Sequence, residues 1–219
     1  MQIPMKIPTK KPTEIEITTV LEERHTPGIH KKIAQARVAI CGLGGLGSTV
    51  AVLLARAGVG TLHLLDFDQV ELSNLNRQQY LVTQVGQYKT EALNEVIKQI
   101  APYCKVVTSR VKLNNSNISA LLMQETIVCE AFDLAENKAL LVNYILENKP
   151  EVFLVSASGM AGYGRNNQIH TRKITSNFYL CGDEVSDCNG EIGLMAPRVA
   201  LCAAHQANQI LELIIEKKK

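Results

Sequence analysis

The chain has 219 residues, of which 46% are hydrophobic and 20% charged, as in a globular protein long enough to bury a sizeable core. Its formal net charge of +2 is too balanced to indicate binding to nucleic acid or to an acidic membrane surface. No apolar run reaches the roughly 18 residues of a transmembrane helix, and the first residues have no continuous apolar segment typical of a secretion signal. We therefore expect a cytoplasmic protein without a membrane or nucleic-acid partner.

Residues 1–28 are rich in proline and lysine and predict an extended N-terminal arm, with one strand at residues 14–20. From residue 29 onward, the spacing of apolar residues predicts alternating helices and strands. The predicted helices are residues 29–36, 48–57, 89–100, 116–123, 135–147 and 196–216. The predicted strands are residues 37–41, 61–66, 105–110, 126–129 and 152–156, while residues 169–174 and 178–180 are edge strands or loop.

This order of elements predicts the fold class. Strands that alternate with helices at this spacing imply a Rossmann-like α/β fold, with a mostly parallel sheet and helices on both faces. No internal repeat or low-complexity linker interrupts residues 29–219, so they are predicted to form a single domain. Residues 166–194 are rich in Gly, Asn, Asp and Ser and are expected to form a long loop over the functional site.

A glycine-rich loop lies between the first predicted strand after the arm and the helix that follows. Gly42, Gly44 and Gly47 form the pattern G-x-G-x-x-G there. The glycines permit a tight turn and let the backbone approach a phosphate, and the helix N-terminus offers free N–H groups. Asp66 ends the next strand, where a carboxylate can hydrogen-bond ribose hydroxyls. The combination predicts a nucleotide-binding domain and leaves NAD and ATP both open.

A polar segment after Asp66 helps to distinguish these nucleotides. It contains Ser73, Asn74 and Arg77, and Lys89 begins the next predicted helix. A triphosphate needs Arg and Lys donors, whereas a simple dehydrogenase has no need for them beside its ribose-binding acid. Taken alone, Arg77 and Lys89 would be explained better as two solvated surface charges.

Several sequence blocks together resemble the ThiF/MoeB-type adenylyltransferases, which are related to ubiquitin-activating enzymes. The blocks are R-V-A-I-C-G-L-G-G-L-G-S from Arg37, L-L-D-F-D-Q-V-E-L-S-N-L-N-R-Q from Leu64, V-G-Q-Y-K-T-E-A-L from Val85, E-A-F-D from Glu130 and M-A-P-R-V from Met195. E-A-F-D followed by S-G-M-A-G-Y-G from Ser158 is most similar to a compact ThiF-like subgroup of thiamine biosynthesis.

The resemblance implies an ATP and Mg²⁺ site whose residues follow by position. The nucleotide-binding set is Gly42, Gly44, Gly45, Gly47, Asp66, Asp68, Ser73, Asn74, Arg77 and Lys89. Asp66 would hold the ribose, while Arg77 and Lys89 would contact the phosphates. Asp133 would be the magnesium-associated carboxylate, at the sheet edge where such folds bind ligands, although a helix N-cap is an alternative role. Arg77, Lys89 and Asp133 are the expected catalytic residues.

The implied reaction is ATP-dependent adenylation of the C-terminal Gly-Gly carboxylate of a small ubiquitin-like sulfur carrier protein, with release of pyrophosphate, in thiamine (thiazole) biosynthesis. The family also implies a homodimer. The alternatives are adenylation of a carboxylate on a modified tRNA base or a peptide, an NAD-dependent oxidoreductase, and a scaffold that binds nucleotide without turnover.

The cysteines set limits on further chemistry. None of the six forms a C-x-x-C pair, so no zinc is expected, and a reducing cytoplasm fits their scatter. Cys181 and Cys188 lie roughly where some family members form a covalent link with the carrier, but the acidic residues nearby disfavour a thiolate. Loop packing is the alternative for both. Arg24 is the candidate for an arginine that the family supplies from the partner subunit.

Overall fold

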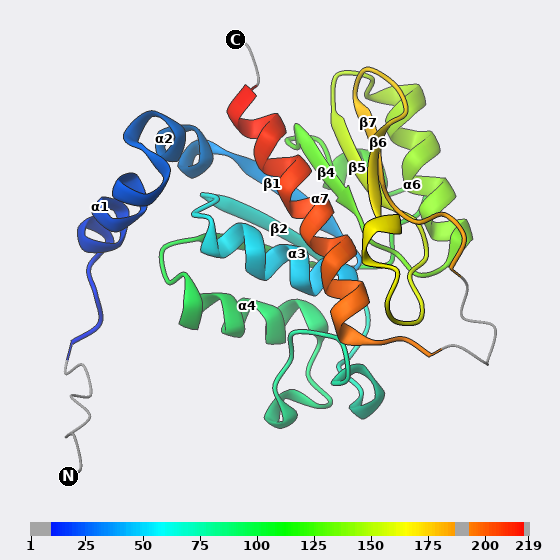
Figure 1. The fold of residues 1–219 in the computed structure, drawn as a ribbon, viewed down its shortest axis with the longest axis horizontal. Coiled ribbons are helices and arrows are strands. Elements are labelled where there is room, and N and C mark those ends of the chain that lie inside the picture. The colour runs from blue at the N-terminus through cyan, green and yellow to red at the C-terminus, as the bar shows by residue number, and fades with distance from the viewer. Residues whose placement is uncertain (1–9, 187–192, 217–219) are drawn as a thin grey trace.

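The computed structural model describes residues 10–186 and 193–216, which form a sheet with helices on both faces (Figure 1). The sheet has seven strands in the order β3-β2-β1-β4-β5-β7-β6. Their bounds are β1 Arg37–Cys41, β2 Thr61–Asp66, β3 Lys105–Arg110, β4 Ile127–Glu130, β5 Phe153–Ala157, β6 His170–Lys173 and β7 Phe178–Gly182. Only β6 runs antiparallel to its neighbour. The predicted α/β fold with a mostly parallel sheet is confirmed.

The strand order predicts a ligand crevice at β1. From β1 the chain builds outward to β2 and β3 on one side and then returns to β4 and β5 on the other. In open parallel sheets, ligands bind at such a reversal, outside the carboxyl ends of the strands. The segments that leave β1, β2 and β4 at this edge carry the predicted site residues.

Helices cover the two faces of the sheet unequally. The described helices are α1 Glu14–His25, α2 Pro27–Gln35, α3 Gly45–Arg56, α4 Lys89–Ile100, α5 Ile118–Leu121, α6 Ala135–Asn148 and α7 Ala196–Glu216, with short 3-10 turns at Leu72–Asn74, Val82–Gln84 and Asn166–Gln168. Helices α3, α4 and α7 share one apolar cluster with the sheet, and α5 and α6 share the other. Figure 1 shows α3, α4 and α7 side by side in front of the strands. Among the described residues, no helix is long and apolar enough to cross a membrane.

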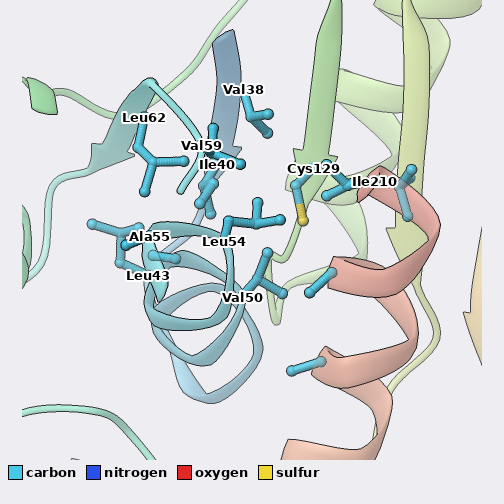
Figure 2. Close-up of a cluster of buried hydrophobic side chains, with 14 of the residues drawn as sticks. Val38, Ile40, Leu43, Val50, Leu54, Ala55, Val59, Leu62, Cys129 and Ile210 are labelled. Carbon is cyan, nitrogen blue, oxygen red and sulfur yellow. The ribbon is translucent and has the colours of Figure 1, made fainter. Parts of the chain in front are cut away.

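The larger core joins the start of α3 to the middle of the sheet. Val50 and Leu54 of α3 are fully buried and lie between strand β1 and Ile210 of α7 (Figure 2). Val38 and Ile40 of β1 meet the same helix because alternate residues of a strand point to one face. This packing fixes α3 against the sheet, and its N-terminus lies at the carboxyl end of β1.

The expected extended arm is wrong over residues 14–28. Glu14–His25 is a helix that begins with a capping box, in which the Thr13 hydroxyl accepts a hydrogen bond from the Glu16 N–H at 3.2 Å and the Glu16 carboxylate accepts one from the Thr13 N–H at 2.7 Å. This reciprocal cap satisfies backbone N–H groups at the helix start and favours a helix over the predicted strand. No residue of α1 is buried, and α1 packs mainly on α2.

The expected long loop at residues 166–194 is also wrong over much of its described length, and residues 187–192 lie outside the described residues. It contains β6 and β7, and β7 pairs in parallel with β5, with Val155 opposite Tyr179. The open choice between strands and loop is therefore decided in favour of strands. The sequence signal was weak because β6, with the sequence HTRK, has no apolar residue and lies at the sheet edge, and β7 is only five residues long.

Candidate nucleotide site

The glycine loop turns sharply from β1 into α3. Gly42 has φ +91°, and an added side chain there would meet the carbonyl oxygen of Ala131 at 2.8 Å. A side chain on Gly47 would lie 1.8 Å from the Gly42 carbonyl oxygen. Helix α3 begins at Gly45, three residues earlier than expected at 48, and no described side chain caps its N-terminus. Its first N–H groups can therefore receive an anion.

Asp66 joins the end of β2 to this loop. Its carboxylate accepts hydrogen bonds from the Leu43 N–H at 2.6 Å and the Asp68 N–H at 2.8 Å. Burial raises the pKa of Asp66, while Lys89 and the two N–H groups act in the opposite direction. A carboxylate has room for about four hydrogen bonds, so Asp66 can still accept from a ribose. The structure thus places Asp66 beside the glycine loop, as the sequence predicted.

Lys89 is buried beside Asp66, which excludes its description as a solvated surface charge. Its ammonium group lies 2.8 Å from the Asp68 carboxylate, and its side chain is only 9% exposed against 47% for Asp68. The Lys89 N–H also donates to the Asp68 carbonyl at 2.9 Å. Asp68 therefore holds a buried cation at the edge of the crevice.

The polar segment after β2 folds over the start of α3. Arg77 donates from Nη1 to the Ser73 carbonyl at 3.2 Å and to the Asn76 side chain at 2.8 Å. Its Cγ lies 3.3 Å from where a Gly45 side chain would begin. Asn74 is buried, and its amide donates to the Ser73 hydroxyl at 3.4 Å. Arg77 is thus brought to the glycine loop, and Ser73 and Asn74 belong to the same folded segment.

Asp133 follows β4, and the two residues before it contact the glycine loop. Ala131 and Phe132 pack against Gly42, and the Ala131 N–H donates to the Cys41 carbonyl at 2.9 Å. Asp133 is exposed and accepts only a short local hydrogen bond from the Leu134 N–H, at 2.9 Å. The N-cap of α6 is Leu134, with no side-chain cap, so the alternative N-cap role of Asp133 is not observed.

The single carboxylate of Asp133 suits Mg²⁺, which also binds phosphate oxygens, better than it suits a metal ion bound only by protein side chains. Within residues 10–186 and 193–216, no group of three or more His, Cys, Asp or Glu could hold an ion. Mg²⁺ is commonly bound by one or two carboxylates together with phosphate oxygens and water. The exposed Asp133 carboxylate is suited to that arrangement.

Three residues of the site were not predicted. Gln78 is buried next to Gly44, and its Oε1 has no hydrogen-bond partner within the described residues. The Tyr80 hydroxyl donates to the Leu43 carbonyl at 2.8 Å, and Glu130 lies buried under the β4 loop. Gln78 and Glu130 belong to the sequence blocks quoted above, which was an available signal. Nothing in the local pattern around Tyr80 indicated its role.

The other candidate residues lie apart from this site or outside the structure. Cys181 is buried in β7, 3.5 Å from the Thr171 hydroxyl, and burial raises the pKa of its thiol to about 11. Such a thiol is a poor nucleophile, which favours the packing role. Cys188 lies outside the described residues. Arg24 lies exposed in the last turn of α1.

The fold is that of a Rossmann-type α/β protein, with the predicted nucleotide crevice at the carboxyl end of β1. Residues 18–219 match the ThiF family, and the chain belongs to that family. Molybdopterin-synthase adenylyltransferase of Escherichia coli is 31% identical over 189 residues, covering 83% of this chain and 74% of the relative. The relatives reported for this chain are named for other reactions, so its likeness to the compact ThiF-like subgroup of thiamine biosynthesis stays a prediction.

Two further relatives match this chain with part of their length. Adenylyltransferase and sulfurtransferase MOCS3 of Caenorhabditis briggsae is 32% identical over 192 residues, covering 84% of this chain and 46% of the relative. tRNA threonylcarbamoyladenosine dehydratase of Haemophilus influenzae is 34% identical over 137 residues, covering 62% of this chain and 52% of the relative. The chain therefore spans about half the length of these two relatives.

The structure comparison supports the same fold. The E. coli tRNA N6-threonylcarbamoyladenosine dehydratase in complex with ATP superposes with a TM-score of 0.84 at 23% identity. The match covers 95% of this chain and 98% of the other. That dehydratase was also solved in complex with AMP, with a TM-score of 0.83.

Proposed function

We propose that this chain uses ATP to adenylate a carboxylate and releases pyrophosphate. The observation that carries the proposal is the position of Arg77 against Gly45 at the uncapped N-terminus of α3, together with the buried Lys89 beside the ribose-suited Asp66. Two cations and a helix N-terminus suit a triphosphate, whereas an NAD enzyme needs only the glycine loop and the acid. Membership in the ThiF family supports the same reading.

The proposed reaction needs positioning and charge neutralisation. The acceptor carboxylate attacks the α-phosphate, the bond to the β-phosphate breaks, and the acyl-adenylate and pyrophosphate form. The nucleophile is already an anion, so no general base is required. Arg77 and Lys89 would neutralise the phosphate charge that develops, and Asp68 would keep Lys89 in place. Mg²⁺ bound through Asp133 would supply further positive charge at the phosphates.

Two acceptors are supported by separate observations. The dehydratase relatives, which match in fold over nearly the whole chain, make a carboxylate on a modified tRNA base the first acceptor to test. The molybdopterin-synthase adenylyltransferase relative keeps the Gly-Gly carboxylate of a small carrier protein as the second. A place in thiamine biosynthesis rests only on the blocks at Glu130 and Ser158. The homodimer stays a prediction.

Exchange of labelled pyrophosphate into ATP tests the reaction directly. The wild-type protein is assayed with tRNA carrying a carboxylate-modified base, with a small Gly-Gly-ending carrier, and without an acceptor. Arg77→Ala should lower acceptor-dependent exchange by about 10²–10³-fold, because each lost donor to the developing charge is worth that much. Asp133→Ala should lower it through loss of the metal ligand.

Arg56→Ala is the matched control, since Arg56 is exposed in the last turn of α3, at the opposite end from the glycine loop. Its exchange rate should equal that of the wild type. Wild-type exchange in both Arg77→Ala and Asp133→Ala would overturn the residue roles. Binding of NAD without binding of ATP would overturn the proposed function in favour of an oxidoreductase.

A further inference from the structure

A charged cluster around the buried Glu130 lies directly beneath the loop that presents Asp133. Glu130, the last residue of β4, is fully buried, and its carboxylate lies 2.5 Å from the Lys138 ammonium group of α6. The same carboxylate accepts a hydrogen bond from the Ser156 hydroxyl of β5. Lys138 also donates to the Ala157 carbonyl at 2.8 Å. The cluster therefore ties together the carboxyl ends of β4 and β5 and the first turns of α6.

The cluster also controls the path of the β4 loop. The second carboxylate oxygen of Glu130 accepts a hydrogen bond from the Phe132 N–H at 2.8 Å. Phe132 immediately precedes Asp133, and it packs on Gly42 of the glycine loop. The backbone on either side of Asp133 is thus held from below, by Glu130 before it and by Lys138 in the helix after it.

Stability alone does not account for this arrangement. A buried ion pair is weak evidence for stability, because apolar residues of similar volume are often as good or better. Here both Glu130 oxygens are occupied, and Lys138 spans two strands and one helix. Such a fully satisfied network selects one conformation of the loop above it.

We propose that Glu130 and Lys138 are positioning residues that hold Asp133 at the metal-bearing side of the nucleotide crevice. The proposal rests on the proposed function, because it assigns Asp133 to Mg²⁺. Residues behind a metal ligand orient it and thereby set the affinity for the metal. Neither Glu130 nor Lys138 touches the nucleotide; they act through the Phe132–Asp133 backbone.

The test compares variants at the two ends of α6. Lys138→Met removes the cluster's cation, and Glu130→Gln with Lys138→Met removes both charges, which avoids a buried unpaired carboxylate if the single variant fails to fold. Lys138→Arg is the conservative variant. Lys149→Met is the matched control, because Lys149 also bonds a backbone carbonyl, that of Leu122 at 2.7 Å, but at the far end of α6.

Each variant is titrated with Mg²⁺ in the presence of saturating ATP by calorimetry, and thermal unfolding is followed alongside. Lys138→Met and the double variant should raise the half-saturating Mg²⁺ concentration about tenfold, as for loss of an outer-shell partner. Lys138→Arg should restore most of the affinity, and Lys149→Met should match the wild type. In exchange assays, the KM for Mg²⁺ should rise in the same variants.

A lower Tm in a folded Lys138→Met or double variant with unchanged Mg²⁺ half-saturation would show a purely structural cluster and overturn the inference. Failure of the proposed function looks different. Wild-type protein that binds Mg²⁺ with ATP but exchanges pyrophosphate with neither acceptor overturns the reaction, while the calorimetric shift still decides the positioning role. Wild-type protein that binds no ATP overturns both.

Discussion

Single residues in the glycine loop are constrained by contacts that leave no room for a side chain. Gly47 lies so close to Gly42 that an added Cβ would be 1.8 Å from the Gly42 carbonyl oxygen and 3.3 Å from the Ala131 side chain. Backbone atoms cannot move aside as the end of a flexible side chain can. The turn between β1 and α3 therefore requires glycine for reasons of space.

The Gly47→Ala variant tests this constraint. The clash should lower the free energy of unfolding by about 1–3 kcal/mol, the range for overpacked sites. ATP affinity should fall as well, because the first turn of α3 must shift. Denaturant unfolding and calorimetric titration with ATP measure the two effects.

Gly28→Ala in α2 is the control, since an added side chain there has nothing within 4 Å. It should be neutral or stabilise the protein by about 0.4–1 kcal/mol, because alanine reduces the conformational entropy of the unfolded chain. A Gly47→Ala protein as stable as Gly28→Ala would contradict the tight approach.

At the scale of elements, an ion pair joins the end of β7 to the start of α7. The Oδ2 atom of Asp183 lies 2.5 Å from Nη2 of Arg198, and the two side chains are 2% and 4% exposed, respectively. Arg198 also donates to the Arg165 carbonyl at 3.2 Å and to the Gly164 carbonyl. Three segments distant in the sequence thus meet at one guanidinium group. One of them, α7, also packs on Gly45 through Val199.

The pKa of Asp183 predicts how this junction responds to acid. Burial favours the neutral acid, but hydrogen bonds from Ser186 and Arg198 outweigh it and lower the pKa from 3.8 to about 2. A carboxyl whose pKa is lower in the folded state contributes stability above its unfolded pKa. That contribution is lost as the pH falls from 3.8 towards about 2.

Asp183→Asn should therefore be less stable than the wild type at pH 7 and should lose less stability on acidification from pH 3.8 to about 2. Denaturant midpoints between neutral pH and pH 2 measure the difference. Glu23→Gln, at an exposed position of α1, is the control and should follow the wild-type curve. Parallel curves for Asp183→Asn and wild type would show that the ion pair does not couple to folding.

At the scale of the whole molecule, the larger apolar cluster connects the sheet to α3, α4 and α7. Leu54 is fully buried in it and lies between β1 and α7, as Figure 2 shows. Its neighbour Leu53 is 36% exposed on the same helix. Replacing each of these adjacent leucines with alanine separates the effect of burial from that of helix propensity. Both substitutions change the helix propensity of α3 by the same amount, so a difference in stability reports on burial.

Leu54→Ala should lower the free energy of unfolding by about 2–5 kcal/mol, through lost burial and a residual cavity. Each kcal/mol should lower the Tm by about 2–4 °C in a protein of this size. Leu53→Ala should change the free energy by about 0.5 kcal/mol or less. Calorimetric thermal unfolding distinguishes them, and equal losses in both variants would contradict the described core.

Much of this protein could be predicted from local sequence because its central strands are buried on both faces. Such strands are continuous apolar runs, and β1 and β2 lie where the runs predicted them. The glycine pattern placed the turn, and the acidic end of β2 placed Asp66 beside it. The helix that begins at residue 14 was not predicted, although Thr13 and Glu16 carry a capping-box pattern that was an available signal.

Other features depend on contacts between residues far apart in the chain, which no local pattern records. Burial of Lys89 against Asp68 follows from how α4 returns under β2, and the pairing of β7 with β5 follows from the open sheet edge. Glu130 and Lys138 are ordinary charges in the sequence, and only the meeting of β4, β5 and α6 makes them a buried cluster. The sequence by itself determined the family, the parallel sheet and the kinds of group in the site. The tertiary structure decided which of those groups are desolvated and paired, because burial and pairing depend on packing across the whole sheet.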